Sequence, residues 1–97
     1  MRLRHTLTAK LIKDARKKAK LSQTDFHYYA GWSTKHTMQL SNIENNLAPV
    51  PPKAVARMAE VLKIPKEVLI ESMVQDYRVC LLDEVELWEE RVKRGVL

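Results

Sequence analysis

The side chains of this chain that could do chemistry are concentrated between residues 22 and 46. Ser22 and Asp25 have the spacing of a helix N-cap and its capping-box partner, and Gly31 can take the positive φ of a tight turn. Apolar residues then recur at helical spacing, at Leu40, Ile43 and Leu47. Two short helices joined by a glycine-containing turn form a helix-turn-helix, whose second helix is shaped to enter the DNA major groove. The chemistry that these residues predict is hydrogen bonding to double-stranded DNA.

The distribution of charge supports a polyanionic partner. The chain of 97 residues carries a net charge of +5. Residues 1–53 contain 10 basic and 3 acidic residues, a net +7, whereas residues 54–97 contain 7 and 9, a net −2. The basic half is the half that contains the helix-turn-helix, as expected where a protein faces phosphates. A charge imbalance of this kind is also compatible with an ordinary solvated surface.

The hydrophobic pattern places helices on both sides of this motif and predicts an all-α, five-helix fold. A first helix is expected at about residues 7–20, where an apolar stripe runs between outward lysines. The second and third are expected at 23–30 and 36–45. A fourth starts near Pro52, which suits a first helical turn, and a fifth follows Ile64 and Pro65. We expect residues 1–68 to form the DNA-binding domain and residues 69–97 a C-terminal helical extension.

The fifth helix is too long for a small domain. Nothing interrupts it between Lys66 and Arg94, and at about 1.5 Å per residue it would span on the order of 40 Å. It carries two apolar stripes, of which one can pack on the chain's own core and the other needs a partner. A second copy of the chain is the simplest partner, and the alternative is a helix that bends back and buries both stripes. The residues expected at a homodimer interface are Leu69, Met73, Tyr77, Cys80, Leu81, Leu87 and Trp88.

The chain resembles the Cro/C1-type (XRE) helix-turn-helix regulators, a family of phage repressors, bacterial transcription factors and antitoxins. The resemblance covers roughly residues 7–70 and depends on Ser22-Gln23, Phe26, Gly31 and the run from Leu40 to Glu44. It implies a Cro/C1-type domain that binds DNA as a homodimer, is repressor-like in function and needs no cofactor. The extended C-terminal helix lies outside the resemblance.

The resemblance also implies roles for individual residues. The residues that fall where the family reads bases are Thr37, Met38, Gln39, Ser41 and Asn42. Asn42 and Gln39 could pair bidentately with adenine, and Met38 could contact a thymine methyl, although an exposed Met is equally often incidental. The residues expected to contact phosphates are Ser22, Gln23, Lys35, His36 and Asn46. Arg16 and Glu44 fall where many family members form an ion pair that positions the recognition helix.

The chain departs from the family pattern around the turn. About two or three residues near 33–36 are extra, His27 stands where a small Ala is usual, and Ala30 stands where a larger Leu is usual. The exchange of a large and a small side chain could preserve the packed volume or rotate the third helix. His27 is expected to be a packed or hydrogen-bonded side chain rather than a ligand.

Other classes of function have little support in the sequence. The three histidines lack metal-ligand spacing, and we find no Gly-rich phosphate loop or nucleophile elbow, so neither an enzyme nor a metal site is expected. Cys80, the only cysteine, is expected to be a core residue, and with no signal peptide or membrane-length apolar run we expect a cytoplasmic protein. The competing hypothesis is an antitoxin or adaptor whose C-terminal helix binds a partner protein.

Overall fold

The computed structural model describes residues 4–32 and 38–95, a chain of helices joined by short loops. The helices are α1 (Thr6–Lys18), α2 (Gln23–Ala30), α3 (Met38–Glu44), the 3-10 turn η2 (Pro52–Ala54), α4 (Val55–Leu62) and α5 (Lys66–Lys93). This order confirms the expected all-α fold of five helices with a long last one. The predicted bounds of the second helix are those observed, and the others differ by one to three residues, apart from the predicted start of the third helix at residue 36, which lies outside the described residues.

Local backbone chemistry explains where the short helices begin and end. At the start of α2, the hydroxyl of Ser22 accepts the N–H of Asp25 at 3.0 Å, and the Ser22 N–H donates to the Asp25 carboxylate at 3.2 Å. Gly31 ends α2 in the left-handed conformation with φ 72°, which costs glycine nothing. Asn46 (φ 63°) after α3 and Lys63 (φ 58°) after α4 take the same conformation. These residues turn the chain back so that successive helices pack on one another.

The core receives side chains from all five α-helices. Its fully buried members are Ile12, Phe26, Leu40, Ile43, Met58 and Leu69. Two side chains expected in apolar stripes, Leu7 in the first helix and Leu47 after the third, are not buried. Leu7 is exposed, because it lies about 140° around α1 from Ile12. Leu47 is 68% exposed, because the left-handed turn at Asn46 ends the helix before Leu47 can continue the face of Leu40 and Ile43.

Residues distant in sequence hold the start of α1. The two carboxylate oxygens of Asp76, on α5, accept the N–H groups of Leu7 and Thr8, each at 2.9 Å. The side-chain amide of Asn46 accepts the N–H of His5 and donates to the hydroxyl of Thr6 at 3.3 Å. Because the first N–H groups of a helix have no intrahelical partner, these contacts cap α1 and join it to α5 and to the loop after α3.

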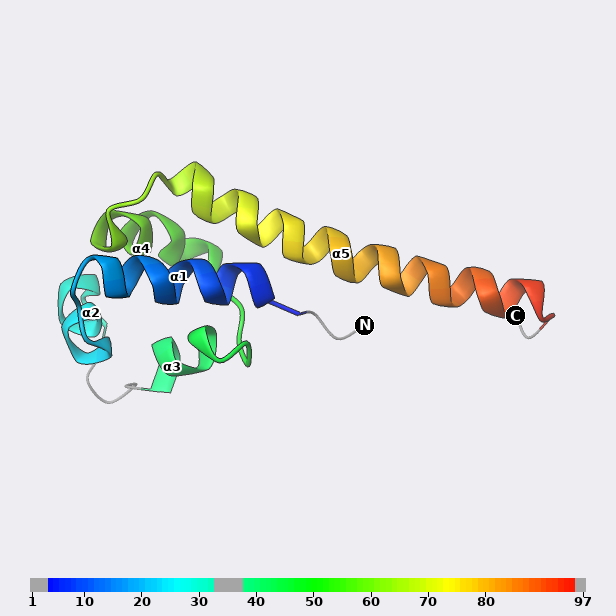
Figure 1. The fold of residues 1–97 in the computed structure, drawn as a ribbon, viewed down its shortest axis with the longest axis horizontal. Helices are drawn as coiled ribbons and strands as arrows, with labels where there is room; N and C mark the ends of the chain where they lie inside the picture. The colour runs from blue at the N-terminus through cyan, green and yellow to red at the C-terminus, as the bar shows by residue number, and fades with distance from the viewer. Residues whose placement is uncertain (1–3, 33–37, 96–97) are drawn as a thin grey trace.

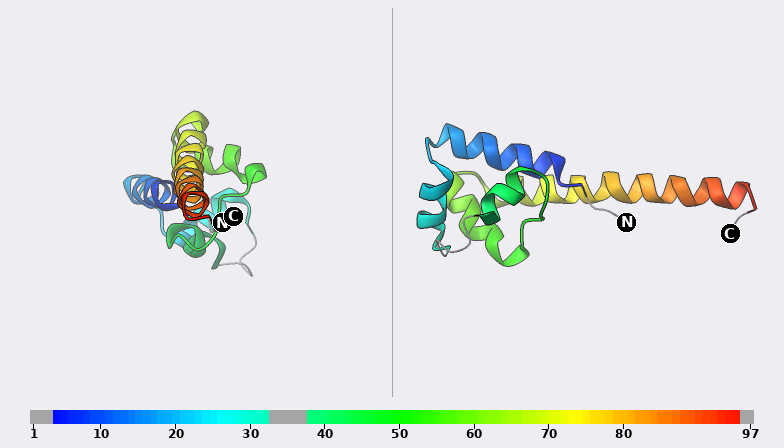
Figure 2. Two further views of the ribbon diagram at one scale, coloured as in Figure 1. Left: turned by 90° about the vertical axis from the view of Figure 1, so that its right-hand side faces the viewer. Right: turned by 90° about the horizontal axis from the view of Figure 1, so that it is seen from below.

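Helix α5 begins in the core and then leaves the body of the molecule (Figure 1). Leu69 is fully buried, and Cys80 is covered where the Arg4 N–H donates to its sulfur at 3.0 Å. Beyond that point the helix projects from the body, as the right view in Figure 2 shows, and the molecule measures 54 × 27 × 21 Å. Helix α5 is continuous across residues 68 and 69. The division into two domains at that point remains a prediction.

Candidate nucleic-acid interface

The two helices of the helix-turn-helix are α2 and α3, and the turn between them begins at Gly31 and Trp32. Helix α3 packs against α1 and α2 through Leu40 and Ile43, and it lies at the edge of the body opposite α5 (Figure 1). Around the rest of α3 and just after its end lie polar side chains that are partly or fully exposed: Gln39, Ser41, Asn42 and Asn45. The Asn45 amide donates to the Ser41 hydroxyl at 3.2 Å, which leaves Gln39 and Asn42 as the side chains of this set with the greater hydrogen-bonding capacity.

A buried ion pair fixes the orientation of α3. The Nε of Arg16 lies 2.8 Å from one carboxylate oxygen of Glu44, and an Nη lies 2.9 Å from the other. The other Nη donates to the carbonyl of Leu21 at 2.7 Å, in the loop between α1 and α2. The two side chains are 11% and 2% exposed. This bidentate geometry connects α1, the α1–α2 loop and the end of α3, which is the arrangement that the resemblance implied.

The N-terminus of α2 offers backbone donors to an anion. The capping box occupies the N–H groups of Ser22 and Asp25. The N–H groups of Gln23 and Thr24 are the remaining first-turn donors, and a helix N-terminus favours negative charge. The side chains of Ser22 and Thr24 are exposed, and that of Gln23 is partly exposed. A phosphate oxygen is the chemical group that suits this position.

Some of the predicted contact residues lie outside the described part of the chain, and one has a different role. Lys35, His36 and Thr37 fall in the undescribed segment 33–37, as does the insertion in the turn, and the side chain of Met38 is likewise not described. Asn46 was expected to contact a phosphate. Its side chain instead caps α1 through His5 and Thr6, so we no longer place it among the phosphate contacts.

The residues around Gly31 pack as an aromatic cluster that the sequence did not reveal. His27 is buried, at 2% exposed, and its ring lies edge-to-face against Trp32 with the centroids 5.2 Å apart. Phe26 contacts the same indole at 5.3 Å. Within the described residues, neither ring nitrogen of His27 has a hydrogen-bond partner. Trp32 therefore anchors the start of the turn, and the large His27 is accommodated by a small neighbour, Ala30.

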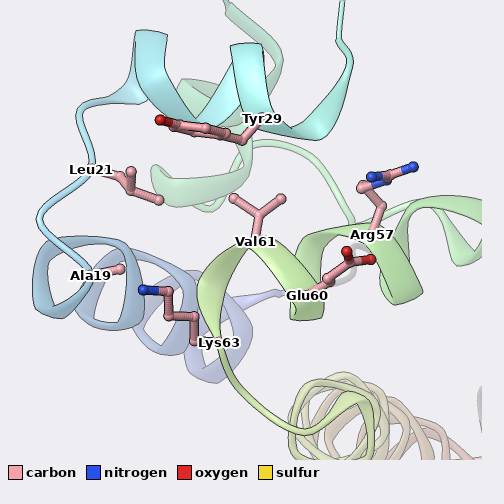
Figure 3. Close-up of a pocket in the computed structure, with 7 residues that line it drawn as sticks. All are labelled: Ala19, Leu21, Tyr29, Arg57, Glu60, Val61 and Lys63. Atoms are coloured by element: carbon pink, nitrogen blue, oxygen red, sulfur yellow. The ribbon is translucent and has the colours of Figure 1, made fainter.

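A shallow hollow of about 520 Å³ lies between α2, α4 and the α1–α2 loop. In Figure 3, Tyr29 faces Val61 across it, with Leu21 at one end and Arg57 at the other. Its full lining is Ala19, Leu21, Tyr29, Arg57, Glu60, Val61 and Lys63. Tyr28 and Tyr29 pack edge-to-face at 5.3 Å, and both are exposed. Exposed aromatic rings beside an apolar floor and a charged rim are typical of protein contact surfaces.

The seven residues expected at a dimer interface divide into a group that the domain covers and a group that is exposed. Leu69 is wholly buried in the chain's own core, Met73 packs against that core, and Cys80 is covered by Arg4. For Leu69 and Cys80 the expectation was wrong, because the first turns of α5 belong to the domain. The other four are 40–50% exposed: Tyr77, Leu81, Leu87 and Trp88. These four remain available to a second chain.

Two further properties of the described residues concern metals and membranes. Among residues 4–32 and 38–95, no three His, Cys, Asp or Glu side chains gather closely enough to hold a metal ion. In the same ranges, none of the helices combines the length and apolar character needed to cross a bilayer.

Solved structures that resemble this one include those of a controller protein of a restriction-modification system, C.Esp1396I. The wild-type crystal structure has a TM-score of 0.58 and 19% identity, covering 75% of this chain and 92% of that one. The chain has the Cro/C1-type helix-turn-helix fold. The C.Esp1396I tetramer in complex with its natural 35 base-pair operator matches with a TM-score of 0.58 and 19% identity, over 74% of this chain and 91% of that one. No protein family model and no curated protein sequence matches the chain.

About a quarter of this chain has no counterpart in these structures. At this level of identity the likeness establishes the fold. The site residues therefore have to be argued from their own geometry.

Proposed function

We propose that this protein is a repressor-like transcriptional regulator that binds a specific sequence of double-stranded DNA as a homodimer. The observation that carries the proposal is the geometry of α3. Its apolar side is fixed in the core, its end is held by the buried Arg16–Glu44 pair, and its outer side presents Gln39 and Asn42. A rigid helix with outward carboxamides is suited to reading base edges. The likeness to a controller protein that was solved with its operator supports the same function.

The proposed contacts fall into two kinds. Gln39 and Asn42 read bases, since a carboxamide can donate to N7 and accept from N6 of adenine in one bidentate pair. The free N–H groups at the start of α2 and the side chain of Gln23 bind a phosphate, which positions the protein without selecting a sequence. The net +7 of residues 1–53 supplies the long-range attraction to DNA. This is a binding function, and we assign no catalytic role to any residue.

The homodimer is supported by the small number of base pairs that one recognition helix can contact and by the exposed side of α5. One helix-turn-helix touches only a few base pairs, so specificity usually requires two copies on half-sites about one helical turn apart. Tyr77, Leu81, Leu87 and Trp88 leave apolar surface exposed on a helix that projects from the domain. Apolar surface of this extent marks an interface. Such a regulator would act in the cytoplasm.

Selection of bound duplexes from a random DNA pool tests the proposal most directly. We expect an enriched motif of two related half-sites, with the spacing of the dimer. The matched control is Asn42→Ala/Gln39→Ala, which keeps the fold but should lose the enrichment. An unenriched pool with the wild-type protein, despite clear DNA binding, would contradict sequence specificity.

A second candidate is an antitoxin or adaptor that binds another protein. The observation that favours it is the exposed Tyr28–Tyr29 pair beside the hollow between α2 and α4, which DNA binding by α3 does not use. The two candidates differ in what Tyr29→Ala should do. Unchanged DNA binding together with loss of a co-purifying protein would support the second candidate, whereas a pure, self-associating protein with full DNA affinity would support the first.

A further inference from the structure

The exposed side of α5 carries one continuous apolar face. Its members are spaced at three and four residues and are 40–58% exposed: Ile70, Val74, Tyr77, Leu81, Val85, Trp88 and Val92. At about 100° per residue they lie within roughly 80° of one another around the helix, over a length of about 33 Å. The packed residues Leu69 and Cys80 lie to one side of this face. The face is therefore unpartnered along its whole length.

The two ends of this face differ in shape. At the domain end, a hollow of about 430 Å³ opens between η2, α4 and α5, and its walls are apolar apart from one phenol. It is lined by Pro52, Val55, Ile70, Met73, Val74 and Tyr77. At the projecting end, the largest side chain of the face is Trp88. The domain end of the face thus has an apolar cavity, and the projecting end has an aromatic side chain large enough to fill a cavity of that kind.

The indole N–H of Trp88 already has a hydrogen-bond partner, so the ring can be buried in an apolar environment. Its only polar atom, the indole N–H, donates to the Glu84 carboxylate of its own helix at 3.2 Å. The guanidinium of Arg91 lies 4.6 Å from the centre of its ring. Burying the indole would leave no donor without an acceptor, which is the usual cost of burying a tryptophan.

We propose that α5 pairs with α5 of a second copy in antiparallel orientation about Leu81, so that Trp88 of each chain fills the hollow of the other. The register follows from the spacing. Val74 and Trp88 each lie seven residues from Leu81, and Ile70 and Val92 each lie eleven, so a two-fold axis at Leu81 brings each pair together. The inference rests on the proposed homodimer and adds its orientation and register.

Charge favours the antiparallel over the parallel arrangement. Residues 81–90 contain five carboxylates and no basic residue, whereas residues 1–80 contain 14 basic and 7 acidic residues, a net +7. A parallel pair would place the two acidic segments side by side, where like charges repel. An antiparallel pair places each acidic segment against residues 72–81 and the basic body of the other copy.

Disulfide cross-linking distinguishes the two orientations. Single-cysteine variants are made in a Cys80→Ala background, with thermal melts to verify folding. After mild oxidation, a mixture of Ile70→Cys and Val92→Cys chains should give a covalent dimer containing one of each, and Val92→Cys alone should give none. Leu81→Cys, which meets itself in both orientations, is the positive control. Cross-linking of Val92→Cys with itself would overturn the antiparallel arrangement, and a monomer in sedimentation at high micromolar concentration would overturn pairing altogether.

The seating of Trp88 has its own measurement. Trp88→Ala should weaken self-association by more than about tenfold, because a buried aromatic anchor dominates an interface. Leu82→Ala, on another side of α5 and similarly exposed, should change it little. Equal effects of the two variants would contradict the seating of Trp88 in the hollow. A protein that cross-links as expected but selects no DNA sequence would refute the proposed function alone, and a sequence-specific protein with parallel cross-links would refute this inference alone.

Discussion

The guanidinium of Arg16 donates to both carboxylate oxygens of Glu44, at 2.8 and 2.9 Å, and so joins the last turn of α1 to the last residue of α3. The Glu44 side chain is 2% exposed, so the guanidinium is the counter-charge of a carboxylate that bulk solvent hardly reaches. The pair thereby connects the stability of the fold to the orientation of the helix that we propose reads DNA.

Arg16→Ala should destabilise the fold by on the order of 3 kcal/mol, because it leaves the Glu44 carboxylate buried without a counter-charge. Lys17→Ala, at an exposed neighbouring position, should change the melting temperature little. Replacing both partners by apolar residues, as in Arg16→Met/Glu44→Leu, should cost less than Arg16→Ala, since no charge is then stranded. Thermal melts of the three variants test this, and equal melting temperatures for the Arg16 and Lys17 variants would refute it.

Asp76→Ala should also destabilise the fold, by about 1–3 kcal/mol, because the N–H groups of Leu7 and Thr8 lose their acceptor at a buried position. Asp83→Ala, on the same helix, is the matched control, since its side chain is 59% exposed and its contact with Arg4 is 3.9 Å long. Chemical denaturation of both variants gives the comparison. An Asp76→Ala protein as stable as Asp83→Ala would show that this capping contact contributes nothing.

Asn42→Ala should weaken binding to the preferred DNA site by about 1–3 kcal/mol and relax the preference at one base pair. Gln23→Ala should instead weaken binding to all sequences by a similar factor, because phosphate contacts position the protein without specifying a base. Titration of each variant against the selected site and a scrambled duplex separates the two effects. A uniform loss from Asn42→Ala would mean that the long turn directs another side chain of α3 to the bases.

DNA affinity should fall steeply with salt, by roughly 0.9 log units per log unit of salt for each phosphate contact. The reason is that the basic half of the chain releases counterions when it binds. The slope should be similar for the preferred and the scrambled duplex, since the phosphates are common to both. Binding that is independent of salt would exclude the phosphate contacts proposed for the start of α2 and the basic surface around it.

Much of the local structure could be predicted from the sequence, because its causes are local. The capping box at Ser22 and Asp25, the left-handed cap at Gly31 and the break at Ile64 and Pro65 depend on residues within one turn of each other. The long-range pairing of Arg16 with Glu44 came from the family resemblance, and the structure contains it. The all-α, five-helix fold follows from these signals and from the 3.6-residue apolar period.

The tertiary structure determines which of several similar side chains on one helix are buried. Asp76 is one carboxylate among several on α5, and only the packing of α1 beside it makes it a helix cap. Leu69, Cys80 and Leu87 lie on the same apolar stripe of α5, yet the domain covers the first two and leaves Leu87 exposed. The spacing of apolar residues shows which of them share a face of a helix, but not whether their own domain or a second chain covers that face. That choice depends on the angles at which α1, α4 and α5 cross, which arise from the packing of the whole core.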